Sequence, residues 1–180
     1  MKKTVSTGLL LVFCLGAGGF GVPKTQIWYS AEELDGGRWQ YNYEVENISL
    51  TPAIDEFTIW FEYGLYENLA VETPGTPPGW DQVVWQPEPV LLDDGAYDAK
   101  ANLENPGIPA ADDPVRVAGF AVNFDWFGVG EPGSQFYEII DPLTLETIDS
   151  GMTKLIPEPA TLLLLALGGL ALLRKPGTPQ

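Results

Sequence analysis

Histidine is absent from this 180-residue sequence, which removes the side chain that most often acts as a general base near neutral pH and most often binds metals. Cysteine is nearly absent too, because the only one is Cys14, in a segment that we expect to be removed. The remaining chain can then form neither a disulfide nor a thiolate metal site. Nucleophilic catalysis by cysteine, or by serine paired with histidine, is excluded as well.

Positive charge is scarce in the middle of the chain. Residues 22–156 contain five Lys or Arg against 24 Asp or Glu, a net charge of −19, while the whole chain carries −16. A domain with this charge repels phosphate backbones and anionic lipid. We therefore expect no nucleic-acid partner.

The N-terminal segment 1–21 has the order of a secretion signal. Lys2 and Lys3 provide the positive start, residues 8–17 are almost wholly apolar, and residues 18–21 are mostly small. The apolar part is too short to span a membrane, which needs about 20 residues. The sequence therefore predicts export by the secretion machinery and removal of the segment by signal peptidase.

The C-terminal segment 156–180 combines a short proline motif, an apolar run and a basic end. A helix over residues 160–173 would be about 21 Å long, short of the roughly 30 Å hydrocarbon core. It could still be held in a thinned membrane, with the basic end on the cytoplasmic side. The motif consists of Pro157, Glu158, Pro159, Ala160 and Thr161, and the basic end is Arg174 and Lys175.

This tail resembles the PEP-CTERM sorting domain of exported proteins from Gram-negative bacteria that make exopolysaccharide. The resemblance implies recognition by an exosortase, a membrane-embedded protease or transpeptidase. It also implies transient anchoring in the inner membrane, followed by transfer to the cell surface or extracellular matrix. The sequence departs from the usual pattern at residues 176–180, which continue past the basic cluster. The alternative is an ordinary terminal membrane anchor without sorting.

The domain between these ends, residues 22–155, alternates apolar and polar residues with period two, which predicts strands with one packed face. Turn-forming residues separate these runs, and no segment before the tail has a sustained helical stripe. We predict an all-β domain, an antiparallel β-sandwich or jelly roll. The alternating sets are Trp39, Tyr41, Tyr43, Val45; Phe57, Ile59, Phe61, Tyr63; and Phe120, Val122, Phe124, Trp126, with shorter candidates at 26–29, 68–72, 82–85, 136–140 and 145–148.

Several sequence segments of the domain also resemble a recurrent module of PEP-CTERM proteins. They are residues 41–47, 57–66, 130–135 and 136–142. This second resemblance implies a secreted all-β module and brings no catalytic residues with it.

Clustered carboxylates are the first chemical feature of the domain. A calcium ion takes several oxygen ligands from irregular loops, but no Asp-x-Asp-x-Asp-Gly loop is present. We expect most of these acids to be solvated, no cofactor to be required, and calcium to be the one candidate ion. A glycosidase pair is disfavoured, because neighbours along a strand point to opposite faces. The calcium candidates are Asp93, Asp94, Asp98, Asp112 and Asp113.

Tryptophans are the second chemical feature. Aromatic rings in polar surroundings can stack on sugar rings. Nearby carboxylates can accept hydrogen bonds from the sugar hydroxyl groups. The competing interpretation, that these rings fill the core, is favoured. The candidate ligand-binding residues are Trp60, Trp80, Trp85 and Trp126.

The sequence thus predicts a non-enzymatic structural or adhesive protein of the cell surface or exopolysaccharide matrix, with exopolysaccharide as a candidate partner. A carbohydrate-binding module is the first alternative and a secreted hydrolase the second. An exposed aromatic strip beside carboxylates would favour binding. A deep cleft with facing acids about 5–10 Å apart would favour hydrolysis.

Overall fold

The computed structural model describes residues 23–72, 77–111 and 115–157. Within these ranges, no helix has the length and apolarity needed to cross a membrane. The predicted secretion signal at 1–21 and the predicted membrane helix at 160–173 lie outside the described residues. The strands are β1 (Thr25–Glu33), β2 (Arg38–Asn47), β3 (Glu56–Phe61), β4 (Tyr66–Val71), β5 (Trp80–Trp85), β6 (Gly95–Ala101), β7 (Arg116–Trp126), β8 (Phe136–Ile140), β9 (Thr147–Met152) and β10 (Lys154–Leu155).

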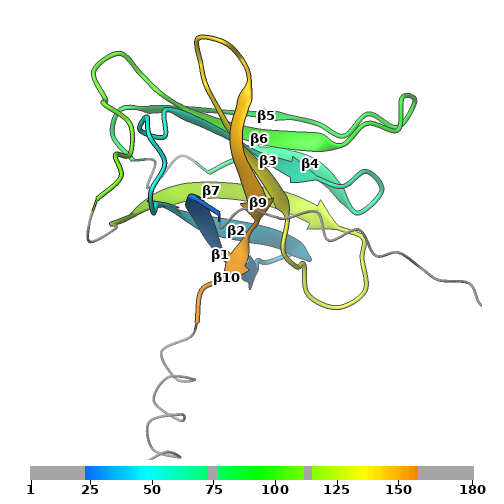
Figure 1. Cartoon of the computed structure of the whole chain (residues 1–180). Coiled ribbons are helices and arrows are strands. Elements are labelled where there is room, and N and C mark those ends of the chain that lie inside the picture. Colours follow the sequence, from blue (N-terminus) through cyan, green and yellow to red (C-terminus); the bar gives the residue numbers. More distant parts are fainter. Residues whose placement is uncertain (1–22, 73–76, 112–114, 158–180) are drawn as a thin grey trace, which may run out of the picture.

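The strands form two five-stranded sheets that lie in two layers (Figure 1). The first sheet has the order β10-β1-β2-β7-β4, and the second has the order β5-β6-β3-β8-β9. Neighbouring strands are antiparallel, apart from the short parallel pair of β1 and β10. The prediction of an all-β fold is confirmed, with two sheets that are mostly antiparallel.

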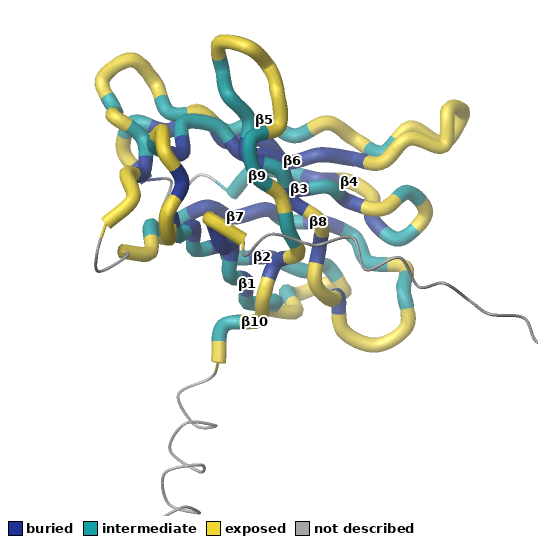
Figure 2. Tube along the Cα trace, in the orientation of Figure 1, coloured by how far each residue is buried: buried dark blue, intermediate teal, exposed yellow. Residues whose placement is uncertain are grey.

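The core consists of buried residues from both sheets (Figure 2), and many of these residues are aromatic. The predicted alternation is confirmed: Tyr41, Tyr43 and Val45 of β2 are buried. Rings from the two sheets meet, since Phe57 of β3 lies 5.0 Å from Phe120 of β7 in an edge-to-face arrangement. This geometry adds to the free energy gained from burying the rings.

The end of the domain crosses from the second sheet to the first (Figure 1). Between β9 and β10, the Thr153 amide donates to the Gln135 carbonyl at 2.8 Å, and the Gln135 amide donates to Thr153 Oγ1 at 2.8 Å. After β10, the Ile156 amide donates to the Tyr29 carbonyl at 2.7 Å. The chain is therefore fastened to the fold until just before Pro157.

Two strands, β6 and β10, were not predicted from the sequence, and a third begins later than expected. β6 was not predicted, because its sequence is rich in Gly and Ala, which have weak strand preference. It is nevertheless placed between β5 and β3, where Tyr97 and Ala99 are completely buried. The strand expected at 145–148 begins later, at Thr147, because Leu145 belongs to the preceding turn and has a positive φ of 60°.

Candidate functional site

A row of apolar side chains crosses the outer face of the second sheet. Trp85 of β5 pairs with Ala96 of β6, and Ala96 pairs with Trp60 of β3. Phe136 of β8 pairs with Met152 of β9. The last residue pair of β3 and β8 is Ile59 and Tyr137. Continuing this antiparallel register by one residue places Phe136 opposite Trp60. Directly paired residues share a face of the sheet, so these five residues form one line, here called the aromatic row.

The aromatic row is open to solvent at most of its positions. The exposed fractions are 53% for Trp85, 43% for Phe136 and 50% for Met152. Ala96 also faces outward, yet only 5% of it is exposed. Because Trp85 and Trp60 flank it, we attribute this burial to the two indoles. Together they offer one apolar surface rather than two separate rings.

The Trp60 indole is held in place by its polar neighbours. Its Nε1 donates to Glu138 Oε2 at 2.9 Å, and Glu138 Oε1 accepts a second hydrogen bond, from Thr147 Oγ1, at 2.8 Å. The ring therefore loses little conformational freedom when a ligand binds to it, and this reduces the entropic cost of binding.

A cavity of about 650 Å³ adjoins one end of the aromatic row. This volume is within the range of small-molecule sites. Trp60 and Trp126, which come from different sheets, both line it beside the carboxylates of Glu62 and Asp94. The other lining residues are Leu65, Tyr66, Gly133, Ser134, Gln135, Phe136 and Met152.

Trp126 is positioned by the loop that follows β7. Its Nε1 donates to the Gly130 carbonyl at 2.8 Å, and its ring lies 4.8 Å from the ring of Tyr66. A Cβ atom at residue 128 would lie 2.0 Å from the indole, so only Gly128 permits this close approach. One role of the glycine-rich segment 128–133 is therefore to leave room for the Trp126 indole.

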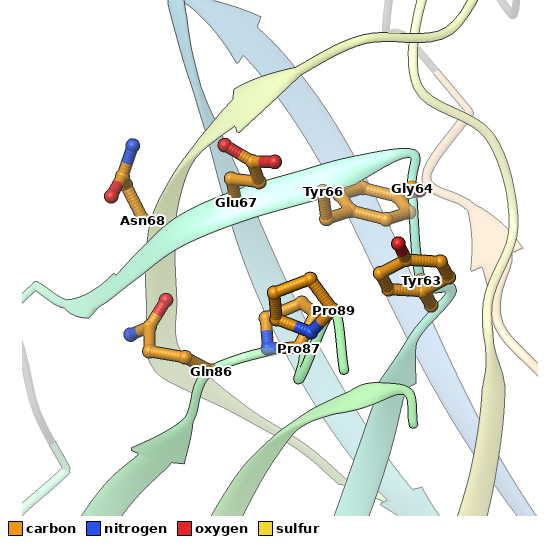
Figure 3. Close-up of a pocket in the computed structure, with 8 residues that line it drawn as sticks. All are labelled: Tyr63, Gly64, Tyr66, Glu67, Asn68, Gln86, Pro87 and Pro89. Carbon is orange, nitrogen blue, oxygen red and sulfur yellow. The ribbon is translucent and has the colours of Figure 1, made fainter. Parts of the chain in front are cut away.

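A smaller cavity of about 260 Å³ lies between the start of β4 and the loop after β5 (Figure 3). One of its polar side chains, Gln86, already forms hydrogen bonds within the fold. The side-chain Oε1 of Gln86 accepts from the Leu69 backbone amide at 2.8 Å, and its Nε2 donates to the Leu69 carbonyl at 2.7 Å. Gln86 therefore closes the β4 edge as a strand would. We therefore regard this cavity as part of the contact between β4 and the loop after β5, and not as a binding site.

The four predicted tryptophans occupy three different environments. Trp60 and Trp126 line the larger cavity, and Trp85 lies at the far end of the aromatic row. Trp80 is only 6% exposed and packs in the core, 5.2 Å from Phe120. The sequence analysis did not single out Phe136 or Met152. Phe136 lies two residues before Glu138 in the predicted strand 136–140, so both share one face of that strand. Met152 joins the row only by pairing with Phe136, and the sequence does not show that register.

The predicted calcium ligands are not gathered in one place. Asp93 and Asp94 are exposed at the turn before β6, whereas Asp98 lies within that strand and is 8% exposed. Asp112 and Asp113 lie outside the described residues. In the part of the chain that the structure describes, no group of three or more acidic side chains is arranged to hold a metal. Calcium binding stays a prediction.

Asp98 has a structural role that gives a test by pH. Burial is the main cause that raises the pKa of its carboxyl, and the negative charge of Glu56 raises this pKa further. The 2.8 Å hydrogen bond donated by Thr58 Oγ1 and the positive charge of Lys100 lower the pKa, but by less. A raised pKa in the folded state gives stability that is present below the unfolded value, about 3.9, and is lost as pH rises through the folded value.

We therefore expect Asp98→Asn, which retains an acceptor for Thr58, to reduce the stability lost between about pH 4 and pH 7. Thermal unfolding at pH 4 and at pH 7 measures this difference in stability. The matched variant Asp93→Asn, at an exposed carboxyl, should leave the difference unchanged. Equal differences in the wild type and in Asp98→Asn would contradict the prediction.

The first residues of the predicted sorting tail are joined to the fold. Leu155 ends β10 opposite Tyr29 of β1, and Ile156 bonds to the same tyrosine's carbonyl. Pro157 is exposed and has no amide to continue the ladder. Pairing with the sheet therefore stops at the proline with which the motif begins. Glu158, Pro159, Ala160, Thr161, Arg174 and Lys175 lie outside the described residues.

Comparison with protein families identifies the PEP-CTERM protein-sorting motif at residues 155–175. The match begins in β10 and includes the proline motif, the apolar run and the basic end. The predicted resemblance of the tail is confirmed, and it marks the chain as an exported protein that an exosortase processes. No curated protein matches the sequence.

Proposed function

We propose that this protein is a non-enzymatic structural or adhesive component of the cell surface or exopolysaccharide matrix of a Gram-negative bacterium. The observation that carries the proposal is the sorting motif, which begins at the last residue of the last strand of the domain. An exosortase that acts on this tail releases or transfers the domain that precedes it. The domain itself, two sheets around one aromatic core, we assign to the β-sandwich class.

Two properties of the domain support an adhesive role and limit its partners. Its exposed aromatic row crosses the outer face of the second sheet from β5 to β9, as suits contact with an extended partner. Its net charge of −19 over residues 22–156 keeps it soluble and separate from anionic surfaces. Calcium remains the one candidate ion, and no cofactor is part of the proposal.

Processing provides the test. In a host with a working exosortase, the surface protein should lack residues 162–174, and in a host without the enzyme the tail should remain. We expect the mature chain to end after Ile156, because the segment up to Ile156 is hydrogen bonded to β1 and a protease needs an unpaired, extended segment. Mass spectrometry of the C-terminal peptide measures both results.

A mature surface protein that retains residues 162–174 beside an active exosortase would refute processing. A C-terminus before Lys154 would show that β10 opens before cleavage. As a control, immunodetection of the intact cells and of the surrounding matrix determines where the protein is located in each host.

A further inference from the structure

We propose that the aromatic row and the adjoining cavity bind an uncharged polysaccharide chain. The inference rests on the proposed function and names the partner of the adhesive domain. Trp85, Ala96, Trp60, Phe136 and Met152 stand on five adjacent strands. Strands lie about 4.8 Å apart, so the row is about 19 Å long. That length suits a ligand of several linked rings rather than one small molecule.

The chemistry of the row fits sugar rings. The face of an aromatic ring carries partial negative charge and attracts the polarised C–H groups on the flat side of a pyranose. The carboxylates of Glu62 and Asp94 stand at the cavity end of the row and can accept hydrogen bonds from hydroxyl groups, which are strong when the acceptor is ionised. Asp94 uses Oδ1 to accept from the Tyr63 amide at 2.8 Å, which orients the carboxylate.

The charge of the site selects among polysaccharides. Glu62 and Asp94 are acidic, and the domain around them has a net charge of −19 over residues 22–156. Uronic acid or sulfated chains are repelled by this field, whereas an uncharged chain is not. We therefore infer a neutral glycan.

Two other occupants fit the face less well. An extended peptide usually binds at a sheet edge, where it pairs with free backbone groups, but β6, β3 and β8 in the middle of this sheet have neighbours on both sides. A second copy of the chain would bring together two domains of the same large charge. It would also have to bury about 800 Å² on each partner, more than a row one side chain wide supplies.

Affinity electrophoresis of the exported protein tests the proposal. The probes are hydroxyethyl cellulose and galactomannan, both uncharged, and alginate, which is anionic. We expect a neutral polysaccharide to retard the wild type. Trp60→Ala and Trp85→Ala should each weaken that binding at least about tenfold, equivalent to about 1.4 kcal/mol. Trp85 is half exposed, so its variant should fold normally, as thermal unfolding will show.

Trp28→Ala is the matched control. Trp28 lies on β1 in the other sheet, and its ring is covered by the Arg116 guanidinium at 4.0 Å, so we expect binding to be unchanged. The proposal is overturned if neither neutral probe retards the wild type, if alginate retards it equally, or if Trp28→Ala weakens binding as much. It is also overturned if sedimentation shows a dimer that Trp85→Ala abolishes.

Failure of this inference is distinguishable from failure of the proposed function. A protein that loses its tail and reaches the surface, but binds neither neutral probe, contradicts only the glycan proposal. A protein that keeps its tail contradicts the processing proposal, whatever it binds.

Discussion

Replacing Phe57 by Ala is expected to lower the free energy of unfolding by about 3–5 kcal/mol. Phe57 is completely buried, and its ring meets Phe120 at 5.0 Å, Trp80 at 6.0 Å and Tyr97 at 6.2 Å. The contact with Phe120 joins the two sheets. Three rigid rings cannot easily collapse into the space left by a fourth, so most of the cavity should remain. Urea denaturation of the exported protein at neutral pH measures the loss.

Phe127→Ala provides the matched control for this prediction. Phe127 is the same residue type but is 59% exposed, so its replacement should change stability by no more than about 0.5 kcal/mol. The dependence of unfolding free energy on urea should be similar in all three proteins if the surface exposed on unfolding is unchanged. A loss below about 1 kcal/mol in Phe57→Ala would show that the core relaxes around the missing ring.

The sequence predicted the strands whose alternation is strong. β2, β3 and β7 carry large apolar residues at every second position, and most of these residues are buried, while Trp39 and Trp126 at the strand ends are half-buried. β6 lacks that contrast, because Ala96 and Ala99 on its opposite faces are the same small residue. Its place in the sheet depends on the neighbours that cover it, and local sequence does not contain that information.

The candidate site was predicted only in part, for a related reason. Trp60 interrupts the polar face of its strand, and that outward position makes it available to a ligand. Trp80 looked equivalent in the sequence but is turned into the core. Alternation along β5 places Trp85 on the opposite face from Val84. The alignment of Trp85 with Trp60 through Ala96 arises from strand register, which depends on pairing between distant segments.

Alkaline pH should unfold the domain, because several core tyrosines must remain neutral in the folded state. Burial is the main cause that raises the pKa of Tyr41, Tyr43 and Tyr97 well above the ordinary value of 10.0. Nearby tyrosines add to the effect for Tyr41 and Tyr43, and Asp98 adds to it for Tyr97. The pKa values of Tyr29, Tyr66 and Tyr137 are also raised, chiefly by burial.

The sign of the pH dependence follows from proton binding. Above about pH 10 the unfolded chain releases its phenolic protons while the folded chain retains them. The folded state then binds more protons, and stability falls as pH rises. Each such tyrosine lowers the free energy of unfolding by about 1.4 kcal/mol per pH unit. Tyr41, Tyr43 and Tyr97 together therefore lower it by about 4 kcal/mol per pH unit. A domain stable by about 5–15 kcal/mol should therefore unfold within about one to four units above pH 10.

Circular dichroism and tyrosinate absorbance, recorded together during an alkaline titration, measure this transition. Most of the tyrosinate absorbance should appear together with the change in circular dichroism, since the buried phenols ionise only when the sheets separate. Tyr97→Phe removes one of the three groups and should reduce the pH slope of stability by about 1.4 kcal/mol per unit. The variant also loses the hydrogen bond to Gln82, which lowers stability at neutral pH but does not alter the slope. Phenolic absorbance that rises fully near pH 10 before the sheets separate would contradict the burial of these hydroxyl groups. A slope unchanged by Tyr97→Phe would exclude Tyr97 as one of the groups responsible.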